Sequence, residues 1–297
     1  VDIIAHCEDP YITLPFPMLS LYRYISMNGI KVTLDGHGCD ELFSGYGNLQ
    51  FALNAVKSKK EYIEILEIDR STHTGIYSPT ERLRIRTVLK QRAKHLLLRS
   101  KSISHSFLSK YHIESQVVSE YYERLSEINA HPVFQQMDVF TQSLYEIFHL
   151  SVLPTLLRNY DKYSMAFGVE NRMPFMDWRL VCYAFSLPLS AKVGDTFTKR
   201  IHRDAVNGVL VDGVRLRRDK IGWNAPSHEW FSGHLAITIN QLIKNSKSRY
   251  KNDALTAWST FSHKKNKTYL DGELLWRRVL RVAWEESLSS SVWRDIK

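Results

Sequence analysis

Segment Asp35–Tyr46 holds the residues best suited to chemistry in this sequence. It contains three carboxylates and two glycines that flank a histidine: Asp35, Gly36, His37, Gly38, Asp40 and Glu41. Glycines permit a tight turn and a close approach to a ligand, and Mg²⁺ takes carboxylate oxygens together with substrate phosphates. An ordinary Asp-Gly turn is the alternative. Position 41 is Glu where a dinucleotide fingerprint needs a third glycine.

Two further segments combine charged residues with apolar residues or glycine. The first, Arg158–Asp177, places these charged side chains in an apolar stretch: Asp161, Lys162, Glu170 and Arg172. Such charges need partners or a cavity, so a functional site and a buried ion pair of Glu170 with Arg172 or Arg158 are both compatible with the pattern. The second, Arg217–Pro226, suits either a phosphate-facing loop or a solvated basic turn.

The elements before the first segment indicate one repeat of an α/β domain. Apolar residues at helical spacing predict a helix over Pro15–Asn28. Alternating apolar residues predict a strand over Ile30–Leu34 that runs directly into Asp35. Helix, strand and loop in this order are typical of a parallel-sheet domain, where ligands gather at the carboxyl end of the strand.

After Tyr46 the sequence predicts mostly helices. Three have defined limits: one capped by Asp138 and stopped near Pro154, one capped by Asp177 and ended before Pro188, and one over Glu273–Glu286. We therefore expect two parts. Residues 1–46 form the last helix-strand-loop part of the nucleotide-binding α/β sheet, and residues 47–297 form the helical remainder of the same domain.

Composition indicates a compact protein of a reducing compartment. Hydrophobic residues make up 44% of the 297 positions, enough for a sizeable core. Three scattered cysteines and no apolar run of bilayer length predict a cytoplasmic protein without disulfides, zinc or membrane contact. The net charge of +9 lies largely in Arg82–Lys101, which predicts a solvated basic helix. Nucleic acid or a membrane surface is the alternative, but the stretch has no aromatics to stack on bases.

Taken in order along the chain, these segments resemble asparagine synthetases. Leu34–Tyr46 resembles the family's L-S-G-(D/E)-G-(G/S)-D-E-(L/V)-F-G-G-Y loop, and Asp161–Asp177 its D-R-x-S-M-A-x-x-x-E-x-R-x-P-F-L-D segment. Other segments resemble the family's A-x-x-L-P end, K-x-x-x-R-x-A helix, K-x-G-F-x-x-P-x-x-x-W pattern and last helix: Ala184–Pro188, Lys199–Ala205, Lys220–Trp230 and Leu275–Arg277 with Trp284. The resemblance covers nearly the whole chain.

The resemblance implies a fold class and an activity. The fold class is α/β, the C-terminal part of an adenine-nucleotide α-hydrolase-like (pyrophosphate-loop) synthetase domain that is mostly α-helical here. The activity is that of a carbon–nitrogen ligase with ATP and Mg²⁺ as cofactors. Aspartate or a related carboxylate is adenylated, and ammonia from a glutaminase domain displaces AMP. The resemblance is also compatible with a homodimer.

The resemblance also implies roles for individual residues. They are nucleotide binding by Asp35, Gly36 and Gly38; Mg²⁺ binding by Asp40; catalysis by His37, Glu170 and Lys220; and acceptor binding by Asp161 and Arg172. Lys220 corresponds to the lysine that faces pyrophosphate in the adenylation transition state. Asp161, Glu170 and Arg172 correspond to a charged wall behind the acceptor.

Two departures from the family pattern put the acceptor in question. Asp35 replaces the usual Ser, and His37 replaces an Asp or Glu. Relatives on this scaffold amidate sugar acids, cyclise peptides or form β-lactams, so another acceptor in surface-polysaccharide or secondary metabolism is an alternative. A non-catalytic helical module that binds RNA or membrane is a second.

Two parts of the family's machinery do not occur in these residues. There is no Ser-Gly-Gly-x-Asp-Ser pyrophosphate loop and no N-terminal Cys nucleophile, and the sequence begins at Val1 rather than Met. We therefore expect a fragment that is inactive by itself.

Overall fold

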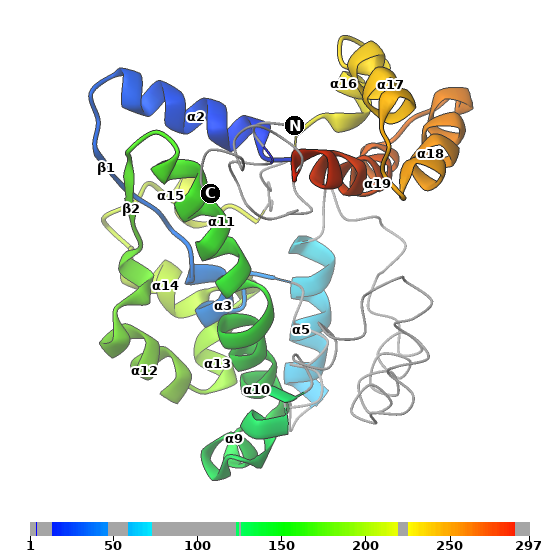
Figure 1. Ribbon diagram of the computed structural model, residues 1–297. Helices are drawn as coiled ribbons and strands as arrows, with labels where there is room; N and C mark the ends of the chain where they lie inside the picture. The colour runs from blue at the N-terminus through cyan, green and yellow to red at the C-terminus, as the bar shows by residue number, and fades with distance from the viewer. Residues whose placement is uncertain are drawn as a thin grey trace. The chain divides into compact units, whose positions relative to one another are not determined.

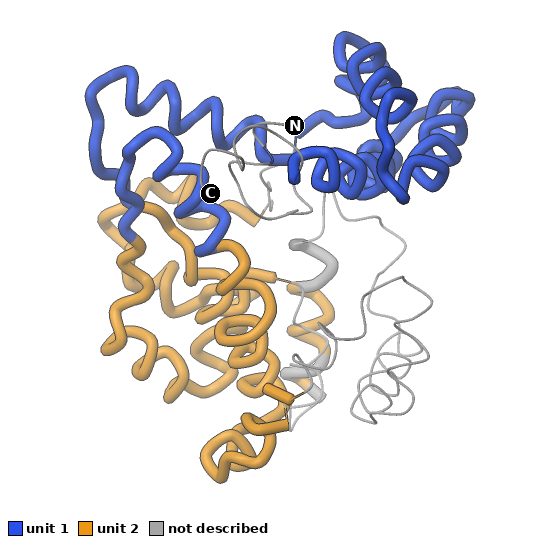
Figure 2. The backbone as a smooth tube through the Cα atoms, viewed as in Figure 1, with its two compact units in different colours: residues 1–34, 157–172, 223–297 blue, residues 35–156, 173–222 orange. Residues whose placement is uncertain are grey.

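The computed structural model describes residues 4, 14–46, 59–72, 123–124, 126–218 and 225–288. Over these residues the chain is mostly helical, with a few short strands (Figure 1). Its contacts form two compact units, one from residues 1–34, 157–172 and 223–297 and the other from residues 35–156 and 173–222 (Figure 2). The expectation of a mostly helical chain is confirmed. The predicted division at residue 46 stays a prediction, because contact clustering does not test it.

The helices and strands alternate little, and helices dominate. In chain order they are α2 (Phe16–Met27), β1 (Val32–Leu34), α3 (Cys39–Phe43), α5 (Lys59–Thr72), α9 (Pro132–Gln136), α10 (Val139–Glu146), the π-helical η2 (Ile147–Ser151), α11 (Leu153–Met165), β2 (Glu170–Arg172), the 3₁₀ turn η3 (Pro174–Met176), α12 (Trp178–Ser186), α13 (Leu189–Lys192), β3 (Val193–Gly194), β4 (Phe197–Thr198), α14 (Arg200–Ala205), α15 (Asp212–Arg215), α16 (Ser227–Ser232), α17 (Ala236–Asn245), α18 (Lys251–His263) and α19 (Tyr269–Ser287). Among the described helices, none has the length and apolar character needed to cross a membrane.

The predicted helix and strand before the glycine loop are both present in the first unit. Helix α2 ends at Met27, and Gly29 follows with a φ of 75°, a left-handed conformation that glycine adopts without strain. Strand β1 pairs in parallel with β2, with Val32 opposite Glu170 and Leu34 opposite Arg172. The parallel pairing agrees with the predicted α/β repeat, although the strand begins two residues later than Ile30.

The C-terminal core of the first unit is built around α19. Helices α16, α17 and α18 pack against it (Figure 1), and Trp276 and Val279 on its buried face are almost fully buried. A capping box of Thr268 and Asp271 starts the helix. Gly272 allows the close approach of α16, because a Cβ there would lie 2.3 Å from the Ser227 hydroxyl oxygen. The predicted helix over 273–286 is confirmed within this longer element.

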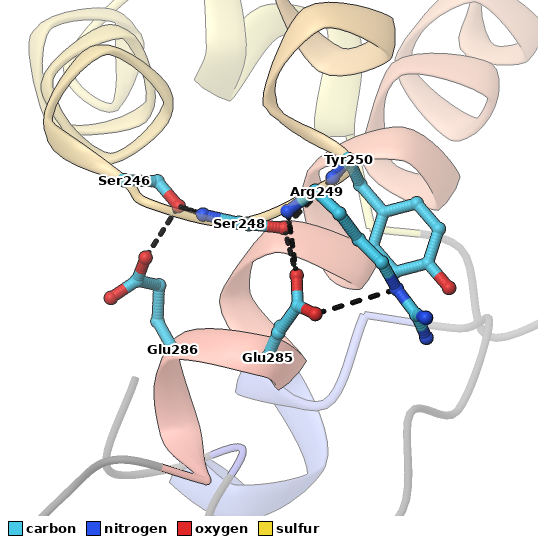
Figure 3. Close-up of polar contacts among 6 residues, drawn as sticks. All are labelled: Ser246, Ser248, Arg249, Tyr250, Glu285 and Glu286. Atoms are coloured by element: carbon cyan, nitrogen blue, oxygen red, sulfur yellow. Dashed lines mark hydrogen bonds and ion pairs between the residues drawn. The ribbon is translucent and has the colours of Figure 1, made fainter.

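Two adjacent glutamates at the end of α19 hold the turn between α17 and α18 (Figure 3). The hydroxyl of Ser246 donates to Glu286 Oε1 at 2.5 Å. The hydroxyl of Ser248 and the backbone N–H of Arg249 donate to Glu285 Oε2 at 2.5 and 2.9 Å. The turn's polar groups are thereby satisfied by carboxylates that belong to another helix, which fixes the turn against α19.

Glu286→Ala is expected to lower the free energy of unfolding by about 1–3 kcal/mol, the cost of leaving the Ser246 hydroxyl without an acceptor. Ser246 is almost fully buried, and the Lys247 N–H also donates to Glu286 at 2.9 Å. These bonds lower the pKa of Glu286, first through Ser246 and then through Lys247, so the contribution is lost as the pH falls through its folded-state value. Urea unfolding at neutral and acidic pH measures this. Exposed Glu229→Ala is the control, and equal losses in both variants would contradict the assignment.

In the second unit, the short helix α3 lies at the centre of the packing. Helices α10, α12 and α14 and the π turn η2 contact it. Two predicted caps are confirmed: Asp138 accepts from the Phe140 N–H at 2.9 Å, and Asp177 accepts from the Arg179 N–H at 2.9 Å. The expected stop near Pro154 is also confirmed, because α10 and the π turn η2 that continues it end at Ser151. Pro154 lies in the first turn of the next helix, α11, where its missing N–H donor is unused.

Candidate functional site

The glycine-rich segment begins with a pair formed by Asp35 and His37. The carboxylate oxygen Oδ1 of Asp35 lies 2.5 Å from His37 Nδ1 and accepts from the His37 backbone N–H at 3.2 Å. The His37 side chain is 12% exposed, so it is largely enclosed without being cut off from solvent. This local turn orients the imidazole and assigns one ring nitrogen to the aspartate.

Gly38 is one position in the segment at which glycine is required. Its φ of 95° lies in the left-handed region, and it is the cap residue from which α3 begins. A Cβ at this position would lie 2.2 Å from Met176 Cε and 3.3 Å from Phe175 Cβ. Gly36, by contrast, has open space around it. Gly38 is thus needed for the protein's own packing, and the close approach of Gly36 and Gly38 to a ligand stays a prediction.

The second half of the segment differs from the predicted loop, because Cys39–Phe43 forms helix α3. Its two acidic side chains, Asp40 and Glu41, differ in burial. Glu41 is buried, with 1% of its surface exposed. Burial raises the pKa of Glu41, against the lowering effects of a backbone hydrogen bond and of the Tyr46 side chain. Glu41 is therefore a core carboxyl, which leaves Asp40 as the partly accessible carboxylate of the helix.

Asp40 forms an ion pair with Lys199, a residue for which the sequence predicted no role at the site. The carboxylate Oδ1 contacts Lys199 Nζ, and the two side chains are 24% and 26% exposed. Gly45 makes room for the pair, since a Cβ there would overlap the Asp40 carboxylate. The Lys199 backbone N–H also donates to the Phe43 carbonyl at 3.1 Å, which ties the start of α14 to the end of α3.

The environment of Lys199 favours its charged form. Burial, the largest single effect, would lower the pKa of the Lys199 ammonium, but the charges of Asp40 and Cys39 and the hydrogen bond to Asp40 together raise it. Lys199 has a φ of 55°, an uncommon conformation for a side chain with a Cβ. Its position in the K-x-x-x-R-x-A resemblance was the available signal, although the pattern alone does not identify Asp40 as its partner.

The predicted acceptor residues lie in the first unit. Asp161 is exposed on α11, and Glu170 and Arg172 stand on β2. Glu170 Oε1 accepts from Arg172 Nε at 2.8 Å, with side chains 57% and 61% exposed. The alternative of an ion pair between these two residues is thus observed, but on the surface and not in the core. Each carboxylate and guanidinium of this group is accessible to a ligand.

Two features named in the sequence lie outside the described residues. They are Lys220, predicted to face pyrophosphate, and the basic stretch Arg82–Lys101. One continuous described segment holds five of the predicted site residues: Asp35, Gly36, His37, Gly38 and Asp40. Their assigned functions stay predictions.

Asp40 is suited to bind a magnesium ion as a single protein ligand. Among the described residues no group of three or more His, Cys, Asp or Glu side chains is arranged to hold a metal. Mg²⁺ in nucleotide sites commonly takes only one or two protein carboxylates and completes its shell with phosphates and water. Asp40, partly exposed and already held against a cation, meets that requirement as a single ligand.

These features define a class of protein: mostly helical, with a parallel strand that leads into a glycine-rich acidic segment. The chain belongs to the Asparagine synthase family, which matches residues 1–294. The resemblance inferred from the sequence is therefore confirmed.

Individual relatives cover most of this chain. Asparagine synthetase (glutamine-hydrolyzing) 3 of Bacillus subtilis is 32% identical over 228 residues, which are 73% of this chain and 31% of the relative. Asparagine synthetase (glutamine-hydrolyzing) 1 of the same organism is 23% identical over 83% of this chain and 39% of its own length. Amidase chry2 of Gibberella zeae is 24% identical over 95% of this chain and 46% of its own length. The chain thus spans less than half of the length of these relatives. No solved structure matches it significantly.

Proposed function

We propose that the chain is part of an ATP-dependent, AMP-forming amide synthetase that converts aspartate to asparagine with glutamine-derived ammonia. The observation that carries the proposal is the Asp40–Lys199 pair beside the glycine-rich turn, in a chain that belongs to the asparagine synthase family. A synthetase of this type must hold a metal-bound nucleotide next to an activated carboxylate, and a carboxylate with an adjacent cation suits that task.

In this proposal Asp40 is the protein's ligand to Mg²⁺. The metal, when bound with ATP, neutralises phosphate charge and so supports attack on the α-phosphorus. The Lys199 ammonium, which pairs with Asp40, would offer a second positive charge to an anionic oxygen of the nucleotide. Lys220 supplies a further cation to the pyrophosphate leaving group in the same proposal.

The Asp35–His37 pair is proposed to act on the nitrogen that enters. Because Asp35 holds Nδ1, the second ring nitrogen, Nε2, is left to accept a proton from the attacking amine. The imidazole would replace the carboxylate that the family places at this position. Asp161, Glu170 and Arg172 are proposed to contact the acceptor through their exposed charges.

A different carboxylate acceptor is the second candidate function. The two departures at Asp35 and His37 favour it, as does the match to a relative named an amidase rather than an asparagine synthetase. In that case the adenylating chemistry stays the same, and only the residues that read the acceptor differ.

A chimera tests the proposal directly. This chain replaces its aligned region in asparagine synthetase 3 of Bacillus subtilis, and AMP and pyrophosphate release are measured with ATP, Mg²⁺ and ammonia. Aspartate-dependent release above the no-acceptor background is expected. Release that needs another carboxylate from an acceptor panel would support the second candidate. A folded chimera that releases neither product with any acceptor would contradict both.

A further inference from the structure

The β3–β4 hairpin of the second unit and the helices that follow it gather six cations, of which half have carboxylate partners. Lys199 pairs with Asp40, Arg200 with Asp195 at 2.7 Å, and Arg215 with Asp212 at 2.8 Å. The remaining three are Arg203, Arg217 and Arg218. No carboxylate of the described residues forms an ion pair with them.

Two of these three guanidinium groups converge on one aromatic ring. The Cζ atoms of Arg203 and Arg218 lie 5.0 and 4.9 Å from the centroid of Phe197 on β4. Both distances fall within the range of a cation–π contact. Both guanidinium groups thus lie against the same ring, although like charges repel each other.

Hydrogen bonds fix both arginines in this arrangement. Arg203 donates through Nε to the Thr198 carbonyl at 2.9 Å and through Nη1 to the Arg215 carbonyl. Arg218 donates through Nη2 to the Thr196 hydroxyl at 2.7 Å, in a turn where Asp195 and Thr196 both have positive φ. The acceptors are neutral, so the groups are positioned but their charge is not compensated.

The charge of this cluster affects its own members. The pKa of Arg203 is lowered, first by burial and then by the positive charges of Arg215, Arg217 and Arg218, while the nearby Cys39 acts in the opposite direction. Repulsion of this kind falls when an anion binds among the cations. The planar fork of a guanidinium matches the oxygens of a phosphate group well.

We propose that Arg203 and Arg218, which both contact Phe197, form a binding site for phosphate oxyanions together with the adjacent Arg217. Two sources share this chemistry: the phosphates of a nucleotide or of pyrophosphate, and free inorganic phosphate. The site itself depends only on the contacts within this unit. Its assignment to nucleotide-derived phosphates rests on the proposed function, and the experiment separates the two.

Titration calorimetry of the chain with pyrophosphate, in EDTA and at constant ionic strength, tests the site. Saturable binding by the unmodified chain is expected. Arg203→Gln and Arg218→Gln are each expected to weaken it about tenfold or more, the usual effect of losing a charged hydrogen bond. Arg217→Gln is expected to weaken it less but measurably. The Arg217 side chain forms no hydrogen bond or ion pair with described residues, and its backbone N–H bond to the Val214 carbonyl is kept in the variant, so this variant does not depend on retained side-chain packing.

Arg200→Gln is the matched control, because it removes the same charge from the same helix but from a cation that already has a carboxylate partner. The proposal predicts less than a threefold change for it. No saturable binding by the unmodified chain, or equal weakening by Arg200→Gln and Arg217→Gln, would overturn the site.

Competition identifies the source of the phosphate. Displacement of pyrophosphate by ATP supports the nucleotide assignment and the proposed function. Binding of inorganic phosphate with equal affinity, without displacement by ATP, supports the anion site and overturns only the nucleotide assignment.

Discussion

Asp40→Asn is expected to reduce pyrophosphate release by the Bacillus chimera at least about 100-fold, the scale on which single electrostatic contributors to a transition state act. The substitution keeps the shape of the side chain but removes the charge that would bind Mg²⁺ and that holds Lys199. The loss is expected in the adenylation step, so glutamine hydrolysis by the rest of the chimera should persist. Coupled assays of pyrophosphate and glutamate measure the two activities separately.

Substitution of Lys199, the other residue of this ion pair, separates two roles of Asp40: metal binding and the positioning of Lys199. If Asp40 acts only by positioning Lys199, then Lys199→Gln should cause the same loss, and neither variant should change the Mg²⁺ concentration for half-maximal rate. If Asp40 binds the metal, only Asp40→Asn should raise that concentration. Asp253→Asn, which removes an exposed carboxylate paired with Arg278, is the control for charge loss. Near-normal release by the Asp40→Asn chimera would contradict its assignment to the metal.

Local signals predicted the features that depend on neighbouring residues. The caps at Asp138 and Asp177 follow from a short side chain that accepts from the next turn, and this geometry is complete within a few residues. The strand before the glycine-rich segment follows from alternation alone. The same holds at Pro154, because a proline marks a helix boundary: the helical run that Asp138 caps ends at Ser151, and Pro154 falls in the first turn of α11.

Partners distant in sequence could not be predicted from pattern. Asp40 and Glu41 are adjacent acids in the sequence, yet Glu41 is buried and Asp40 pairs with Lys199. Which acid faces the core depends on the turn that begins at Gly38 and on the packing of α10, α12 and α14 around α3. The family pattern indicated that both segments matter, but the contact between them required the fold.

The same limit applies to Lys192, a buried lysine of the second unit. Its side chain is fully buried at the end of α13, and its Nζ has no hydrogen-bond partner among the described residues. Phe185 offers a ring at 5.5 Å, which compensates only part of the lost hydration. Burial lowers the pKa of Lys192 from its ordinary 10.5 to about 8, with the charge of Asp138 acting weakly against this. The sequence shows only a lysine before a valine.

Lys192→Met is therefore expected to raise the free energy of unfolding at pH 7 by about 3 kcal/mol, since each pKa unit corresponds to about 1.4 kcal/mol. Methionine keeps the length of the side chain and its contacts with the surrounding apolar residues. Urea unfolding of the chain measures the gain. Lys244→Met, which changes an exposed lysine of α17, is the control and should leave stability within about 0.5 kcal/mol of the unmodified chain.

The pH dependence distinguishes removal of a charge from improved packing. The folded-state pKa of Lys192 lies below its unfolded value, so between pH 8 and 10.5 the unfolded chain binds a proton that the folded chain does not. Raising the pH through this range therefore stabilises the unmodified chain and has no such effect on Lys192→Met. The advantage of the variant should be full below pH 8 and decline toward pH 10.5. If the gain is the same at pH 7 and pH 10, methionine acts through packing. The buried charge of Lys192 then does not lower the free energy of unfolding by the amount inferred from its pKa.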